Sequence, residues 1–341
     1  MLLKTIKELI IMSCGITSIG LYIPPQTITS SQISKETGIP ESILINKYGI
    51  SKKRRARSHE TSYFMGIKAA EDALKKSEIT ATDLDVIIWV GSQNTEKFMW
   101  VTAISLASDL GADNAWAFDM TALCGSMLAG ISIAKSLLDS HQEYSNILLV
   151  GGCRDIDYLD TNNPNTHFLL DLSSGAASVL ISNENCSNTI LGDSFKCDGS
   201  LSNICYATRE TKKTHGNSDM QIRFLMNDSE KFKNTLNMTS INNFETVIKN
   251  SLKKSNMTPS DIDYLAILHI KRSAHEEILK RINLENSKSL YLSNFGHMEQ
   301  FDPILSLFLA ESKGLINKGS NVVLVSAGLG FIWGAIVIYY K

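Results

Sequence analysis

The chain has 341 residues, 43% of them hydrophobic and 20% charged, and 33 lysines and arginines against 35 aspartates and glutamates give a net charge of −2. This composition is typical of globular proteins and excludes disordered, collagen-like and coiled-coil chains. The one short basic run, residues 52–55, is too small for the clustered positive surface of a nucleic-acid-binding protein, so no nucleic-acid partner is expected. The length exceeds the usual size of one hydrophobic core and favours two domains or a duplicated one.

Apolar segments along the chain predict a series of strands. The first covers residues 16–23, and residues 1–11 ahead of it are interpreted as a disordered extension. Further strands are predicted at residues 86–90, 115–120, 147–150, 175–181, 264–268, 289–292, 322–325 and 334–338. Segments with helical spacing of apolar residues alternate with these strands, which indicates an α/β fold.

Residues 321–340 carry no charge and are long enough to span a bilayer. However, β-branched residues on both sides of Gly328 and Gly330 predict two buried strands joined by a glycine turn. We therefore expect no membrane-spanning segment.

Six cysteines are spread over the chain without a Cys-x-x-Cys pair, at positions 14, 124, 153, 186, 197 and 205. This spacing in a long chain indicates neither a disulfide framework nor a zinc site. We expect a reducing, cytoplasmic location and no bound metal.

The chain contains an internal repeat. Residues 74–85 and 252–263 are offset by 178 positions and are identical at seven of twelve positions. In each copy an amphipathic helix precedes the block and an apolar strand follows it. The repeat predicts two α/β halves, at residues 12–184 and 185–341. Between them, residues 193–240 are polar, and we predict a long irregular segment that covers the site.

Three loops that follow predicted strands carry the residues with candidate chemistry. Cys124 lies between the strand at 115–120 and a helix, His269 ends the strand at 264–268, and His297 lies in the equivalent loop of the second half. Ligand sites of α/β sheets form at the carboxyl ends of strands, so the three loops are expected to converge. An arbitrary cysteine is more often a small core residue, and the loop position of Cys124 is what favours a reactive thiol.

A thiol at a helix N-terminus is a suitable nucleophile, because the helix dipole favours the thiolate. A nearby histidine can exchange protons with it, and two backbone N–H groups can hold the oxyanion of an attacked thioester. The candidates for these two donors are the backbone N–H groups of Cys124 and Leu329. Leu329 lies within the turn that contains Gly328 and Gly330.

Three motifs resemble the β-ketoacyl-acyl carrier protein synthase III family of the thiolase superfamily. Residues 119–126 resemble its nucleophile motif, residues 329–335 its C-terminal glycine motif, and Gly49 and Ile50 with the following basic run its early Gly-Ile-Arg segment. The resemblance extends from residue 15 to the end of the chain. It implies a thiolase-like fold of two duplicated halves in a five-layered α-β-α-β-α sandwich, and a homodimer.

The resemblance also implies the reaction. An acyl-thioester donor, either acyl-coenzyme A or an acyl carrier protein with its phosphopantetheine arm, acylates Cys124, and the thioester is a substrate, so no cofactor is expected. A malonyl thioester then loses carbon dioxide and attacks the acyl group. The family's catalytic histidine maps onto His269. Phe98 and Trp100, with Gly328 and Gly330, are expected to shape the substrate site.

The chain departs from the family's pattern at several positions. The family's catalytic asparagine falls on His297, and Glu299 or Asp302 behind it could orient a histidine, although Asp302 is equally well explained as a helix-start residue. Ile43 replaces the tryptophan that stacks on coenzyme A, and Ala274 stands nearest the position of a docking arginine. These differences favour secondary-metabolite or specialised lipid biosynthesis over housekeeping fatty-acid initiation.

Three functions remain open at this point. The first is a 3-oxoacyl synthase that joins an acyl group to a carbanion by Claisen condensation. The second is an acyltransferase that passes the acyl group to an alcohol, amine or thiol without condensation. The third is a non-catalytic subunit of a heteromeric ketosynthase, and the presence of both Cys124 and His269 counts against it.

Overall fold

The computed structural model describes residues 14–341 except 92–96, 98, 185 and 215–216. The predicted extension at residues 1–11 and the predicted substrate residue Phe98 therefore lie outside the described residues. Among the described residues, no helix is both long enough and apolar enough to cross a bilayer.

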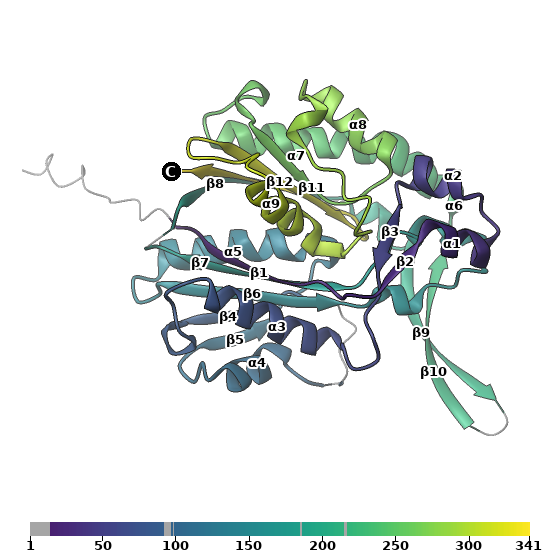
Figure 1. Ribbon diagram of the computed structural model, residues 1–341, viewed down its shortest axis with the longest axis horizontal. Coiled ribbons are helices and arrows are strands. Elements are labelled where there is room, and N and C mark those ends of the chain that lie inside the picture. The colour runs from purple at the N-terminus through teal and green to yellow at the C-terminus, as the bar shows by residue number, and fades with distance from the viewer. Residues whose placement is uncertain (1–13, 92–96, 98, 185, 215–216) are drawn as a thin grey trace, which may run out of the picture.

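Two mixed β-sheets form the frame of the molecule (Figure 1). The first has the order β1-β7-β6-β4-β5 and the second the order β11-β12-β13-β8. The strands of the first are β1 (Gly15–Tyr22), β4 (Val86–Trp89), β5 (Trp116–Asp119), β6 (Asn146–Cys153) and β7 (Gly175–Ser182). Those of the second are β8 (Asn188–Cys197), β11 (Tyr264–Ile267), β12 (Asn321–Gly328) and β13 (Ile332–Tyr340).

Helices cover the sheets in three layers, which gives the five-layered α-β-α-β-α sandwich (Figure 1). Strand β4 shows how the sequence builds it: Val86 and Ile88 face the core between the sheets, and Ile87 and Trp89 face the outer helices, as the two-residue period of a strand requires. The outer helices of the first sheet are α3 (Ser62–Lys75) and α4 (Thr102–Leu110), the middle layer holds α5 (Ser126–Ser140) and α9 (Asp302–Ser312), and α7 (Ile241–Lys254) and α8 (Arg272–Arg281) cover the second sheet.

The predicted duplication is present in the structure. Strand β4 pairs parallel to β6, which pairs antiparallel to β7, and β11, β12 and β13 repeat the same pairings in the second half. The repeated sequence blocks form the same local turn, because the N–H of Thr80 donates to Asp83 at 2.8 Å and that of Thr258 donates to Asp261 at 2.7 Å. The C-terminal apolar run forms β12 and β13, so the prediction of two strands rather than a membrane span is confirmed.

One predicted strand is absent: residues 289–292 form no ladder. Side chains supply the hydrogen bonds of this segment, because the Ser289 hydroxyl donates to the carbonyl of Leu265 and the N–H of Leu290 donates to the Tyr264 hydroxyl. The second sheet therefore lacks the counterpart of β5.

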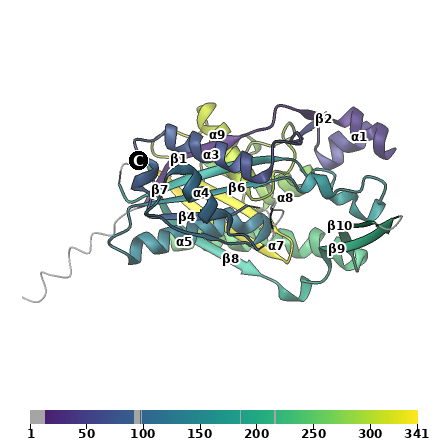
Figure 2. The same ribbon diagram turned by 90° about the horizontal axis from the view of Figure 1, so that it is seen from below.

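The segment at 193–240 is not irregular, as the prediction had it. It holds the end of β8, a hairpin of β9 (Cys205–Thr214) and β10 (Asn217–Met226), and α6 (Ser229–Asn234). The two strands of the hairpin pair with each other along their whole length, and that pairing gives order to a polar segment. In Figures 1 and 2 the hairpin extends from the end of the molecule opposite the C-terminus. The same end carries β2 (Thr27–Thr29), α1 (Ser30–Thr37), α2 (Glu41–Ile43) and β3 (Lys52–Arg54).

Candidate active site

The loop of Cys124 joins β5 to α5 through one turn of 3₁₀-helix, Leu123–Gly125. The Ser126 hydroxyl fixes this turn, since it accepts from the N–H of Ala122 and donates to the carbonyl of Leu123, both at 2.7 Å. Leu123 adopts a φ of 48°, in the left-handed region that non-glycine residues rarely occupy. Cys124 is partly exposed and stands at the entry to α5, as the sequence predicts.

The end of β12 packs directly against this loop. The Ser326 hydroxyl donates to the carbonyl of Cys124 at 2.5 Å. A Cβ on Gly328 would lie 3.0 Å from the backbone nitrogen of Cys124, a tighter contact than most side chains make, so glycine favours this approach. Leu329 and Gly330 continue from it along the same cavity wall. The predicted oxyanion donors therefore come from segments that lie side by side.

His297 is held by its backbone. Its N–H donates to the carbonyl of Asp171 at 2.7 Å, and its own carbonyl accepts from the N–H of Ser173 at 2.9 Å. The preceding residue, Gly296, has a φ of 71°, and a Cβ there would lie 2.6 Å from the same Asp171 carbonyl. Glycine at 296 is therefore a condition for placing the histidine.

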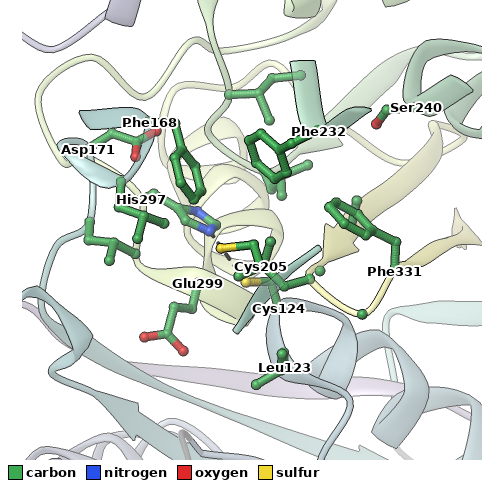
Figure 3. Close-up of a pocket in the computed structure, with 18 of the residues that line it drawn as sticks. Leu123, Cys124, Phe168, Asp171, Cys205, Phe232, Ser240, His297, Glu299 and Phe331 are labelled. Atoms are coloured by element: carbon green, nitrogen blue, oxygen red, sulfur yellow. Dashed lines mark hydrogen bonds between the residues drawn. The ribbon is translucent and has the colours of Figure 1, made fainter. Parts of the chain in front are cut away.

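Cys124, His297 and Asp302 form a continuous chain of side-chain contacts. The Cys124 sulfur lies 3.5 Å from Nε2 of His297, a contact drawn in Figure 3, and Nδ1 of His297 lies 2.5 Å from Oδ2 of Asp302. Burial alone lowers the pKa of His297, but the charges of Asp302 and Cys124 outweigh it and raise that pKa well above its ordinary value. The geometry suits a protonated imidazole that donates to sulfur and carboxylate together.

Asp302 is fully buried and accepts two further bonds from backbone. Its Oδ2 accepts from the N–H of His269 at 2.8 Å, and its Oδ1 accepts from the N–H of Met298 at 2.7 Å. These bonds fix the carboxylate that orients His297 and join the His269 loop to it.

The ring of His269 contacts other partners than the ring of His297 does. Its Nδ1 lies 3.2 Å from Oδ2 of Asp171 and its Nε2 lies 3.4 Å from the carbonyl of Gly49. Burial raises the pKa of Asp171, yet the hydrogen bond and charge of His269, with the charges of His297 and Lys53, lower it overall. Among the contacts of the described residues, His297 rather than His269 bonds to the Cys124 sulfur. Asp171 is a site residue that the sequence analysis missed.

A cavity of about 630 Å³ opens in front of Cys124 and includes both histidines in its wall. Apolar side chains from several elements line most of it, among them Leu268, Phe168, Phe224, Phe232, Phe244 and Phe331. Residues 202–240 supply part of this wall, so the prediction that the segment covers the site is confirmed.

Glu299 also lines the cavity but does not orient a histidine. Its carboxyl hydrogen-bonds to that of Asp155, and burial together with the Asp155 charge raises the pKa of Glu299 well above its ordinary range. Of the two acids that the sequence singles out, Asp302 is therefore the one that contacts His297.

Trp100 is placed elsewhere. Its ring packs against Tyr63 at 5.0 Å and its Nε1–H donates to Ser105 at 2.6 Å, and it is not part of the cavity wall of this chain. Within the described residues, no group of three or more His, Cys, Asp or Glu side chains is arranged to hold a metal ion.

Comparison with known proteins agrees with the fold. Residues 118–199 match the family model for 3-oxoacyl-[acyl-carrier-protein] synthase III, and residues 252–340 match the model for the C-terminal part of that enzyme. The chain is 29% identical over 331 residues to β-ketoacyl-[acyl-carrier-protein] synthase III of Clostridium tetani, an alignment that covers 95% of this chain and 97% of the relative.

Solved structures of low sequence identity share the fold. The crystal structure of 3-oxoacyl-[acyl-carrier-protein] synthase III from Aquifex aeolicus superposes with a TM-score of 0.83 at 21% identity, covering 96% of this chain and all of the other. The priming β-ketosynthase of the R1128 polyketide pathway superposes with a TM-score of 0.81 at 17% identity, covering 96% and 97% of the two chains.

A cysteine in a strand-to-helix loop of a duplicated, five-layered α/β fold defines the class: an acyl-transferring condensing enzyme of the thiolase superfamily. Within this class the chain belongs to the 3-oxoacyl-[acyl-carrier-protein] synthase III family.

Proposed function

We propose that the chain takes an acyl group from a thioester onto Cys124 and joins it to a carbanion, as a 3-oxoacyl synthase of a secondary-metabolite or specialised lipid pathway. The observation that supports the acylation step is the contact chain from the Cys124 sulfur through His297 to Asp302. The donors we propose are coenzyme A and carrier-protein thioesters. The relatives are acyl-carrier-protein synthases by name, which supports the carrier protein.

The acylation step uses groups that the site already holds. The Cys124 thiolate attacks the thioester carbonyl and forms a new C–S bond, while backbone N–H groups of Cys124 and Leu329 receive the oxyanion. When the intermediate collapses, the bond from the carbonyl carbon to the donor sulfur breaks and His297 gives its proton to that sulfur. The products are acyl-Cys124, a free thiol and a neutral His297.

Condensation then follows from the family membership. A malonyl thioester loses carbon dioxide, and the electron pair left on its α-carbon attacks the acyl carbonyl and expels Cys124 as thiolate. The enolate oxygen of this step needs hydrogen-bond donors. Neutral His297 keeps its one N–H at Nδ1 toward Asp302, so its Nε2 donates only after the ring takes up a proton again. His269 supplies a further donor only if its ring leaves the contacts with Asp171 and Gly49.

One observation favours a second candidate, acyl transfer to an alcohol, amine or thiol. A neutral His297 backed by Asp302 is the arrangement of a general base, as in nucleophilic triads. It removes the acceptor's proton as the heteroatom attacks, and expulsion of Cys124 restores the pairing of thiolate and protonated His297. This route needs no second donor.

The test is intact-mass analysis after incubation with a panel of acyl-coenzyme A and acyl-carrier-protein thioesters. We expect an adduct on the wild type and on Cys197→Ala, whose exposed thiol lies outside the cavity, and none on Cys124→Ala. No adduct on the wild type, or an undiminished one on Cys124→Ala, would contradict both enzymatic functions and favour a non-catalytic subunit.

Addition of malonyl thioester to the acylated protein separates the two reactions. Release of carbon dioxide with a 3-oxoacyl product supports condensation. Loss of the adduct to an amine, alcohol or thiol without carbon dioxide supports acyl transfer. His297→Asn distinguishes the two reactions. An amide still donates a hydrogen bond, so condensation is expected to persist, but it is not a base, so acyl transfer is expected to be lost.

A homodimer is also part of the proposal. Strand β5 is an edge of its sheet, and Trp116 on it and Ile104 on the adjacent α4 are 51% and 56% exposed. Apolar side chains on an unpaired edge favour association with a second copy. Light scattering of the wild type and of Trp116→Asp, expected to shift toward monomer, tests it. We further propose a cytoplasmic location, which fractionation of the native host tests.

A further inference from the structure

The cavity has two chemically different sides. In Figure 3, Phe168 and Phe232 lie on one side of the Cys124 and His297 contact, and Glu299 lies on the other. The aromatic side is apolar, whereas the second side brings the carboxyls of Glu299 and Asp155 to the cavity wall.

The two sides also differ in depth. Lys271 and Ser273, at the start of α8 in the outer helix layer, are exposed residues of the cavity wall. Glu299 is 4% exposed and precedes α9 in the middle layer, where neighbouring Gln300 donates its side-chain N–H to the carbonyl of Val90. Tyr206 and Ala207 of β9 are also exposed residues of this wall. A thioester arm that reaches the surface past these residues and the start of α8 leaves the acyl group on Cys124 toward Glu299.

The Glu299 carboxyl is incompletely satisfied by the protein. One hydrogen bond joins it to Asp155, so the two carboxyls share a proton. Its Oε1 is buried and has no hydrogen-bond partner among the described residues. A buried acceptor without a donor destabilises a protein, and such groups in native structures call for an explanation. An O–H or N–H from a bound molecule supplies the missing donor, and a plain hydrocarbon chain does not.

We infer that the acyl group accepted by Cys124 carries a hydroxyl or amino substituent near its carbonyl, and that Glu299, with Asp155 behind it, binds that substituent. The inference rests on the proposed function, because it concerns the acyl group of the same covalent intermediate. Glu299 is then a specificity-determining residue: its Oε1 accepts the substituent's proton in a hydrogen bond, and no covalent bond to it forms or breaks.

The test compares acylation rates of Cys124 by N-acetylcysteamine thioesters of butyrate and of its 2- and 3-hydroxy and 2- and 3-amino derivatives, followed by intact mass. We expect the wild type to favour one substituted thioester over butyryl by about 10²-fold or more, since sites built to bind a hydroxyl or amine strongly reject analogues that lack it. Glu299→Leu is expected to abolish that preference while still reacting with butyryl thioester, which shows that the nucleophile is intact.

Two more variants sharpen the result. Glu299→Gln keeps a donor and an acceptor in the same place, so the preference for the substituted thioester that Glu299→Leu loses is expected to be retained. Glu311→Gln is the matched control: Glu311 is an acid of α9 that accepts from the Tyr340 hydroxyl, outside the cavity wall, and the preference is expected to persist.

Equal rates for butyryl and all substituted thioesters on the wild type would overturn the inference, as would an unchanged preference in Glu299→Leu. Both results leave the proposed function standing, because Cys124 is still acylated. Absence of any adduct, with these thioesters and with the coenzyme A and carrier-protein panel, would contradict the proposed function and the inference with it.

Discussion

The two histidine–aspartate pairs of the site are interlocked. Asp302 receives the side chain of His297 and the backbone N–H of His269. Asp171 receives the side chain of His269 through its carboxylate and the backbone N–H of His297 through its carbonyl. Each aspartate thus positions both histidines, and a change in either one affects both loops.

Asp302→Asn is expected to slow acylation of Cys124. The neutral amide does not stabilise the positive charge of protonated His297. Its NH₂ group would also face one of the two backbone N–H groups that donate to the Asp302 carboxylate. Loss of positioned acid–base function costs about 10²- to 10⁴-fold in rate. Rapid-quench mass analysis measures the effect, with the exposed ion-pair residue Asp139 replaced by Asn as control. A rate within twofold of the wild type would contradict the role of Asp302.

The pair of Asp171 and His269 predicts a stability change at acid pH. The folded pKa of Asp171 lies below its ordinary value near 3.8, so the stabilisation is fully present above about pH 4 and is lost as pH falls through the folded pKa. Asp171→Asn lacks this bond, which corresponds to roughly 1.5–3 kcal/mol for a hydrogen bond to a charged group.

Urea unfolding of the wild type and Asp171→Asn between pH 3 and 7 measures this difference. The gap in unfolding free energy is expected to be constant near neutrality and to narrow below pH 4. A gap that widens as pH falls would show that the sign of the Asp171 shift is wrong.

The parts of the site that could be predicted are those with a pattern in the neighbouring sequence. Cys124 and His297 follow predicted strands in a duplicated pattern, so both loops were visible in the sequence. Asp171 is 98 positions from His269, and its one local sign is an acid inside the apolar run 168–172. That Asp302 rather than Glu299 contacts His297 depends on how the turn before α9 is oriented, and sequence spacing does not determine this.

At the scale of elements, the nucleophile loop and the end of β12 depend on each other. Gly328 allows the close approach, and Ser326 binds the carbonyl of Cys124. The strands that bear them were predicted from apolar runs. The absence of a strand at 289–292 was not predicted. Side-chain groups of Ser289 and Tyr264 form the hydrogen bonds there in place of a ladder, and such bonds do not change the hydrophobic periodicity of the sequence.

Gly328→Ala is expected to impair the site more than the fold. The added Cβ contacts the Cys124 nitrogen, and overpacking of this kind costs about 1–3 kcal/mol. We expect acylation to fall at least tenfold while circular dichroism is retained. Gly199→Ala is the control, since its Cβ would meet nothing within 4 Å and its φ is not left-handed. Equal acylation rates of the two variants would contradict the account of Gly328.

At the scale of the molecule, the two halves share one core. Phe301 and residues of α5 and α9 pack in a single cluster with strands of both sheets. The chain is therefore two fused α/β halves that share a middle helix layer, rather than two separate domains. The internal repeat in the sequence predicted the two fused halves.

A shared core predicts cooperative unfolding. Variants that retain only Trp89, in the first half, or only Trp333, in the second, with the other tryptophans replaced by phenylalanine, report on each half by fluorescence. We expect coincident urea transitions by both probes and by circular dichroism. Two separate midpoints would show that the halves are independent units.

The central claim is that His297, oriented by Asp302, is the partner of the Cys124 sulfur. Its most direct test is the rate of Cys124 alkylation by iodoacetamide, followed by peptide mass mapping at about pH 6 to 8, because the thiolate rather than the thiol reacts. The exposed Cys197 serves as internal control. We predict that His297→Gln slows Cys124 alkylation by about tenfold or more at pH 7, since the thiolate loses its cationic partner, and that His269→Gln leaves it within about threefold of the wild type, since His269 has other partners. A larger loss in His269→Gln than in His297→Gln, or no loss in either, would contradict the account.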